Sequence, residues 1–202
     1  TQGVSSAASD VYKRQTINLG QGGNTVTISN TTDTTINGSL TVLSGNGVDN
    51  VEFTDNAATT VSGSVTLNLG NGNNIITLDG DGGSLIGGAL TILTGTGDDV
   101  VTIGNAGSLF SINGSASITL GNSIAGNELT LASTQIGGNL SYVGGTGSDT
   151  VTFTDDAVAN IVGGRVSANM GGGADTFEID PVPVSTTGTC LLYTSDAADD
   201  TP

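Results

Sequence analysis

The feature that most constrains this chain is an internal repeat with a period of roughly 25 residues. Aligned copies read GQGGNTVTI, GNGVDNVEF, GNGNNIITL, GTGDDVVTI, GTGSDTVTF and GGGADTFEI, and they begin at Gly20, Gly45, Gly70, Gly95, Gly145 and Gly171. A degenerate copy, SIAGNELTL, occupies 123–131, next to a small insertion at 121–122. Such a period is typical of solenoids, in which one coil cannot bury its apolar strip without neighbouring coils.

Each copy carries two segments that alternate apolar and polar residues, as β-strands do. The first segment follows the glycines, and the second begins at Ile36, Val61, Ile86, Ile112, Ile136 and Val162. Gly and β-branched residues interrupt every window that could form a helix. We therefore predict an all-β, right-handed parallel β-solenoid with coils of about 25 residues, the hand being that of other parallel crossovers. The inward residues are expected to be Val26/Ile28, Val51/Phe53, Ile76/Leu78, Val101/Ile103, Leu129/Leu131, Val151/Phe153 and Phe177/Ile179 in the first segment, and Leu40/Val42, Val65/Leu67, Leu90/Ile92, Ala116/Ile118, Leu140/Tyr142 and Val166/Ala168 in the second.

Both ends of the chain differ from the repeat. Residues 5–15 (SSAASDVYKRQ) and 190–200 (CLLYTSDAADD) can be encoded by opposite strands of one DNA segment that resembles a transposase-type sequencing adapter. We therefore divide the chain into a non-native tail at 1–15, a solenoid segment of a longer protein at 16–189 and a second non-native tail at 190–202. The tails are expected to lie off the coil stack. This division leaves Arg165 as the one basic residue of the solenoid segment and assigns Cys190 to a tail.

Charge limits the partners. The formal net charge is -16, so the surface repels nucleic acid and anionic lipid headgroups. The chain also lacks a run of about 20 apolar residues, so no membrane insertion is expected. The expected partners are neighbouring coils of the full-length chain and a surface protein or glycan.

The glycine-rich segments contain the candidate metal ligands Asp49, Asp99, Asp149 and Asp175. Their G-x-G-x-D pattern resembles the calcium-binding nonapeptide of RTX-type secreted proteins, which implies Ca²⁺ as the one candidate cofactor. The pattern departs from that family because it occurs once per coil and not in tandem. The alternative, which we favour, is a structural turn ladder in which Asn and Asp bond to nearby backbone. In it, the series Asn24, Asp49, Asn74, Asp99, Asn127, Asp149 and Asp175 would limit repulsion between stacked carboxylates.

Two further sequence patterns bear on chemistry. The carboxylate pairs Asp98/Asp99, Asp155/Asp156 and Asp79/Asp81 meet a minimal requirement for glycoside hydrolysis, but they fall in corners and connectors, where solvated charge is ordinary. A polysaccharide lyase would also need a base and a cation, whereas the solenoid segment has no His and one Arg, so we expect no catalytic residues and no enzyme. Outward Thr and Ser columns resemble those of ice-binding solenoids. A single column next to a mixed one is explained by β propensity and cross-strand contacts.

Taken together, residues 16–189 resemble adhesin-like and haemagglutinin-like β-solenoids of bacterial surface or secreted proteins. The resemblance implies an extracellular or cell-surface location and a non-enzymatic structural or adhesive role. Two alternatives stay open: a calcium-binding RTX-like module, and a non-catalytic part of a carbohydrate-active β-helix enzyme.

Overall fold

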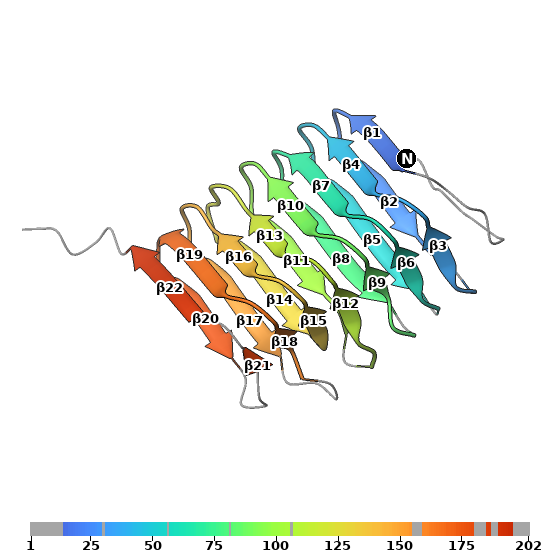
Figure 1. Ribbon diagram of the computed structural model, residues 1–202. Helices are drawn as coiled ribbons and strands as arrows, with labels where there is room; N and C mark the ends of the chain where they lie inside the picture. Colours follow the sequence, from blue (N-terminus) through green and yellow to red (C-terminus); the bar gives the residue numbers. More distant parts are fainter. Residues whose placement is uncertain are drawn as a thin grey trace, which may run out of the picture.

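The computed structural model describes residues 14–29, 31–55, 57–80, 82–105, 107–154, 159–179, 185–186 and 190–195. All regular structure in them is β-strand, and the strands stack as a parallel solenoid that runs from β1 at one end to β22 at the other (Figure 1). The predicted fold class is confirmed. The strand register repeats every 25 residues between the early coils, as in the pairing of Leu40 with Val65 and of Val65 with Leu90.

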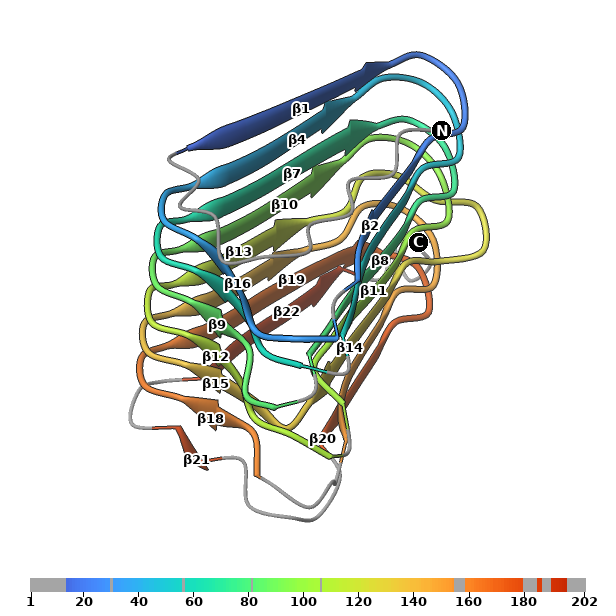
Figure 2. The same ribbon diagram turned by 90° about the vertical axis from the view of Figure 1, so that its right-hand side faces the viewer.

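Three parallel sheets form the faces of the solenoid, as Figure 2 shows. Sheet I contains β1 (Gln15–Gly20), β4 (Leu40–Ser44), β7 (Val65–Gly70), β10 (Leu90–Thr94), β13 (Ala116–Thr119), β16 (Leu140–Val143), β19 (Val166–Gly172) and β22 (Cys190–Ser195). Sheet II contains β2 (Thr25–Ile28), β5 (Asn50–Asp55), β8 (Ile75–Gly80), β11 (Val100–Ile103), β14 (Glu128–Ala132), β17 (Thr150–Thr154) and β20 (Thr176–Ile179). Sheet III contains β3 (Thr34–Ile36), β6 (Thr59–Val61), β9 (Leu85–Ile86), β12 (Phe110–Ile112), β15 (Thr134–Ile136), β18 (Ile161–Val162) and β21 (Ser185–Thr186).

The third sheet corrects the expectation of two strand segments per coil. The predicted second segment is divided by a corner, so that Ile36 ends a strand of sheet III and Leu40 begins one of sheet I. The Asn37–Gly38–Ser39 corner turns the chain between the two sheets. The equivalent corners of neighbouring coils stack closely. A Cβ added at Gly63 would lie only 2.8 Å from the carbonyl oxygen of Gly38 in the preceding coil. Strands of two or three residues are too short to show an alternation, which is why the pattern concealed this sheet.

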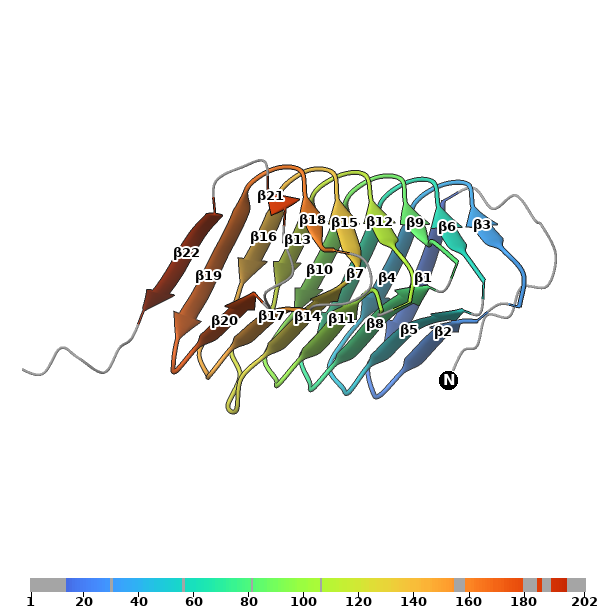
Figure 3. The ribbon, with the colours of Figure 1, turned by 90° about the horizontal axis from the view of Figure 1, so that it is seen from below.

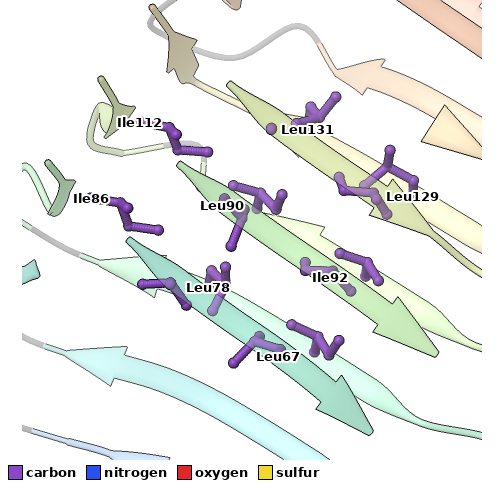
Figure 4. Close-up of a cluster of buried hydrophobic side chains, with 14 of the residues drawn as sticks. Leu67, Leu78, Ile86, Leu90, Ile92, Ile112, Leu129 and Leu131 are labelled. Atoms are coloured by element: carbon purple, nitrogen blue, oxygen red, sulfur yellow. The ribbon is translucent and has the colours of Figure 1, made fainter. Parts of the chain in front are cut away.

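The core lies between the three sheets as one continuous cluster, part of which Figure 4 shows. Of the predicted inward residues, all are buried except Ile28, Phe177 and Ile179, which belong to the first and last coils. Sheet III adds buried aliphatic side chains such as Ile86 and Ile112. A further layer comes from Leu69 and Met170 in sheet I and from Leu120, which directly follows β13. The inward and outward assignment made from the alternation is therefore confirmed for the inner coils.

Residues 190–195 depart from expectation. They form β22, which pairs with β19 in parallel and continues sheet I, so this part of the predicted tail lies on the coil stack (Figure 3). An open sheet edge presents unpaired N–H and C=O groups, and any extended, β-prone segment can add to it. Leu192 stands opposite Ala168 in this register and remains 48% exposed, because β22 is the last described strand of the sheet. Residues 1–13 and 196–202 lie outside the described residues.

The predicted irregular coil is also present. Val100 pairs with Glu128, 28 positions later, and Glu128 pairs with Thr150, only 22 positions later. The extra residues form a loop at 121–127, where the side chain of Ile124 is 97% exposed. The carboxylate of Asp98 accepts the backbone N–H groups of Ile124 and Ala125, both at 2.9 Å, and so ties this loop to the preceding coil. These backbone hydrogen bonds lower the pKa of Asp98.

Candidate functional site

The predicted Asn and Asp series forms one column at the corner between sheets I and II. Each member directly precedes a strand of sheet II, so the repeat places equivalent side chains above one another. The five inner members are buried: Asp49, Asn74, Asp99, Asn127 and Asp149. We call the seven residues Asn24, Asp49, Asn74, Asp99, Asn127, Asp149 and Asp175 the corner column.

One hydrogen bond repeats along the whole corner column. In each step, the backbone N–H of one member donates to the side-chain Oδ1 of the equivalent residue in the next coil. The N···O distances run from 2.7 Å at Asn127–Asp149 to 3.1 Å at Asp99–Asn127. Each side chain thus satisfies a buried backbone donor that would otherwise be costly to leave unpaired.

The side-chain amides of the asparagine members also donate hydrogen bonds. The Nδ2 of Asn74 donates to Oδ1 of Asp99 at 2.9 Å and to the carbonyl oxygen of Gly72, in its own corner, at 2.9 Å. Asn24 makes the equivalent pair of bonds to Asp49 and Gly22. An amide therefore serves the corner on both sides, as an acceptor for the preceding coil and a donor to the following one.

The aspartate members are less fully bonded. Oδ2 of Asp49, Asp99 and Asp175 is buried and makes no hydrogen bond to another protein atom, while Oδ2 of Asp149 accepts the backbone N–H of Gly145 at 3.1 Å. Burial raises the pKa of Asp99, and the nearby hydroxyl of Thr94, together with hydrogen bonds from Asn74, opposes that rise. Burial likewise raises the pKa of Asp149, to which the nearby charge of Asp175 contributes.

The alternation of amide and carboxylate fails at one step. Asp149 and Asp175 occupy consecutive coils, and the bond between them is the backbone N–H of Asp149 to Oδ1 of Asp175, at 2.9 Å. Tyr142 lies near this step: it is 1% exposed, its hydroxyl makes no hydrogen bond to another protein atom, and burial together with Asp149 and Asp175 raises its pKa. Two carboxylates and a phenol therefore share a low-dielectric corner without an amide donor between the carboxylates.

The four predicted metal ligands are spread along the column. Asp49 and Asp99 are separated by the Asn74 coil, and Asp99 and Asp149 by the Asn127 coil, so only Asp149 and Asp175 are consecutive. Within the described ranges, no three His, Cys, Asp or Glu side chains come together in a group that could hold a metal ion. Any cation at this corner would depend on the Asp149–Asp175 step and on uncharged oxygen ligands.

The predicted carboxylate pairs have separate surroundings. Asp98 binds the 121–127 loop, whereas Asp99 belongs to the buried column. Oδ1 of Asp79 accepts a hydrogen bond from Nδ2 of Asn105. Asp81, Asp155 and Asp156 lie outside the described residues. Asp79, Asp98 and Asp99 each therefore accept a hydrogen bond from a neighbouring coil.

The Thr and Ser columns lie on the outer faces, as predicted. On sheet I, the pairing runs from Thr41 through Thr66 and Thr91 to Ser117, and then to Ser141 and Ser167. On sheet II, Glu52 stands between Thr27 and Thr77, and Glu178 pairs with Thr152. The hydroxyl column is therefore uninterrupted from β4 to β19 on sheet I, whereas on sheet II it is limited to Thr77, Thr102, Thr130 and Thr152 among these strands.

A second set of buried polar residues was not predicted. Asn160 accepts the backbone N–H of Thr134 at 2.8 Å and donates to the carbonyl oxygens of Leu131 and Thr154 at 3.2 and 3.0 Å. Ser84 accepts the backbone N–H of Thr59 at 3.0 Å. Both sit just before a strand of sheet III, in the position that the corner column holds relative to sheet II. The available sequence signal was a small polar residue directly before an apolar one. That signal can be interpreted only once the strands of sheet III are known.

Comparison of this chain with protein-family models, with curated proteins and with solved structures finds no match. Among the described residues, no helix has the length and apolar character needed to cross a membrane. The functional assignment therefore depends on the geometry of the corner column and of the sheet faces.

Proposed function

We propose that this chain is a non-enzymatic structural segment, a rigid spacer within a larger extracellular or cell-surface protein of bacteria. The observation that supports the spacer role is the unbroken hydrogen-bond column from Asn24 to Asp175. Every coil is tied to the next at the same corner, in addition to the sheet pairing and the shared apolar core.

A spacer needs stiffness along one axis, and the repeated corner bond supplies it in each coil. Stacking at the parallel strand spacing of about 4.8 Å gives a rod of roughly 30–35 Å for seven coils. Repeat proteins of this kind depend on contacts between neighbours, so additional coils lengthen the rod without a new core design.

The second candidate is a calcium-dependent module, favoured by the Asp149–Asp175 step. Consecutive carboxylates with a buried, unbonded Oδ2 on Asp175 suit an oxygen-seeking cation better than the alternating part of the column does. In this candidate the ion neutralises the step and completes the stack.

Small-angle X-ray scattering of the full chain in EDTA, and again in Ca²⁺, tests the spacer against the calcium module. A spacer gives the same rod-like distance distribution in both buffers. Scattering from an expanded chain in EDTA that becomes rod-like only with Ca²⁺ would reject the spacer as stated and support the calcium module.

A further inference from the structure

The outer face of sheet I differs from the rest of this acidic molecule. No strand of sheet I contains Asp, Glu, Lys or Arg, although the chain carries a net charge of -16. The charged strand residues Glu52, Asp55, Asp79, Glu128 and Glu178 all belong to sheet II. Sheet III is also uncharged, but its strands have only two or three residues, so sheet I is the broad uncharged face (Figure 2).

Two side-chain columns cover this face. The first is a hydroxyl column, and the second contains amide, aliphatic and hydroxyl side chains in register. The members are Thr16, Thr41, Thr66, Thr91, Ser117, Ser141 and Ser167 in the first column, and Asn18, Leu43, Asn68, Leu93, Thr119, Val143 and Asn169 in the second. Leu93 is 41% exposed at the centre of the stack.

Charge selects the partner for this face. Two copies of a strongly anionic chain repel each other, and most approaches would set carboxylates against carboxylates. Contact through sheet I brings two uncharged faces together and leaves the acidic face of sheet II in solvent. A basic partner gains nothing here, since the face offers no carboxylate to pair with.

We propose that two copies of this chain associate face to face through sheet I. The arrangement is isologous, so the same columns are used by both copies. This proposal goes beyond the spacer function and does not depend on where the protein is located. Two sheets can pack face to face, as the sheets of β-sandwiches do at about 10 Å.

The size of the face sets the strength expected. Seven strands at about 4.8 Å and four to five residues at about 3.3 Å give a plane of roughly 500 Å² per copy. That is below the roughly 800 Å² per partner of a standard stable interface, so the association should be weak and concentration-dependent. Salt should strengthen it, because salt screens the repulsion between the two anionic bodies.

Sedimentation velocity of the full chain over a concentration series, at low and high salt, measures the association. We expect the mass to rise from one copy to two, and the dissociation constant to fall at high salt. The double variant Thr91→Asp/Ser117→Asp places carboxylates on adjacent strands of the face and should raise the dissociation constant at least tenfold. The matched control is Thr77→Asp/Thr102→Asp, which makes the same change on adjacent strands of sheet II and should leave the constant within about twofold of the wild type.

Thermal melts of both variants establish that they fold. If the sheet I double variant does not fold, Leu93→Asp at an exposed position replaces it, with the same expected loss of association. A wild-type chain that stays monomeric up to about 1 mM would overturn the proposal. So would equal effects of the sheet I and sheet II variants. A chain that stays monomeric and instead sediments with insoluble cellulose through sheet I would show that the partner is a polysaccharide. That outcome would also overturn the proposal.

Discussion

Asn74 donates both its backbone N–H and its side-chain Nδ2–H to Oδ1 of Asp99, at 2.8 and 2.9 Å. One carboxylate oxygen thus receives two hydrogen bonds from the preceding coil, while the other oxygen of the same carboxylate makes none to the protein. These two bonds need an acceptor oxygen, which a side-chain amide would supply as well as a carboxylate. The ladder interpretation of Asp99 therefore predicts that the acceptor suffices, whereas a metal-binding interpretation predicts that the negative charge is needed.

The first prediction concerns Asp99 itself. Asp99→Asn keeps the Oδ1 acceptor and supplies an amide that can donate to its own corner, as Asn74 does to Gly72. The free energy of unfolding at neutral pH should therefore stay the same or rise. Asp99→Ala removes the acceptor for both Asn74 donors and should cost about 1–3 kcal/mol or more. Denaturant titrations with unchanged m-values measure both effects, and an equal loss in the two variants would show that the charge matters.

The second prediction concerns pH. Burial raises the pKa of Asp99 and Asp149 above the ordinary value of 3.8, so the folded state binds protons more readily than the unfolded state. Their contribution to stability is fully present below 3.8 and is lost as pH rises through the folded pKa values. Asp98, whose pKa is lowered, acts in the opposite sense and loses its contribution as pH falls through its folded value, below 3.8.

Mild acidification from neutral pH toward pH 3.8 should therefore raise the melting temperature of the wild type. The double variant Asp99→Asn/Asp149→Asn should show a smaller rise, because the two groups that take up protons on folding are gone. Melting temperatures across this pH range test the point. A steady fall of the wild-type melting temperature on acidification would contradict it.

The third prediction concerns the inward and outward assignment. Val101 is fully buried and Thr102, the next residue in β11, points outward. Val101→Asp places an unpaired charge in the core and should cost about 4 kcal/mol or prevent folding. Thr102→Asp should cost about 1 kcal/mol or less. Denaturant midpoints in the reverse order would contradict the inward position of Val101 and the outward position of Thr102.

The fourth prediction concerns close stacking at the glycine corners. Gly72 has φ of +127°, and a Cβ there would lie 1.9 Å from the carbonyl oxygen of Gly47 in the preceding coil. Gly22, in the first coil, also has positive φ, +98°, but a Cβ there would meet nothing within 4 Å.

Both Gly72→Ala and Gly22→Ala incur backbone strain, of about 1–2 kcal/mol. Only Gly72→Ala also forces two coils apart, so its loss of stability should clearly exceed that of Gly22→Ala. Unfolding free energies of the two variants measure the difference. Equal losses would show that backbone conformation alone selects glycine at these corners.

The sequence predicted some levels of this structure and concealed others. The alternation around Val51, Ile76 and Val101 identified the core because strands of four to six residues show a clear period of two. Sheet III was concealed because strands such as Leu85–Ile86 are shorter than that period can reveal. The addition of β22 to the stack was missed because it depends on an open edge of β19, which composition does not show.

The candidate site was predictable in part for a similar reason. The period placed Asp99 and Asn74 in one column, and their residue types indicated bonds to backbone. Which oxygen is used, and which is left without a partner, depends on the geometry of the corner and not on the residue types. The role of Asn160 needed the third sheet, and the environment of Tyr142 needed the register of sheet I.

The last prediction concerns calcium at the Asp149–Asp175 step. If these carboxylates bind Ca²⁺ in the native state alone, the ion adds RT ln(1 + [L]/Kd) to the stability, and the melting temperature rises with its concentration. Mg²⁺ should substitute poorly, because it demands a tight octahedron that a glycine-rich corner does not offer. If the step is only part of the ladder, Ca²⁺ should do no more than NaCl of equal ionic strength, through screening.

Thermal melts of the full chain in Ca²⁺, Mg²⁺ and matched NaCl distinguish these outcomes. Asp175→Asn should abolish any calcium-specific gain and, by supplying an amide beside Asp149, should raise stability in the absence of the ion. Asp49→Asn is the matched control, because Asp49 lies between the asparagines Asn24 and Asn74 and is not consecutive with another carboxylate. Identical melts of the wild type in all three salts would reject calcium binding at this step and leave the hydrogen-bonded column as its role.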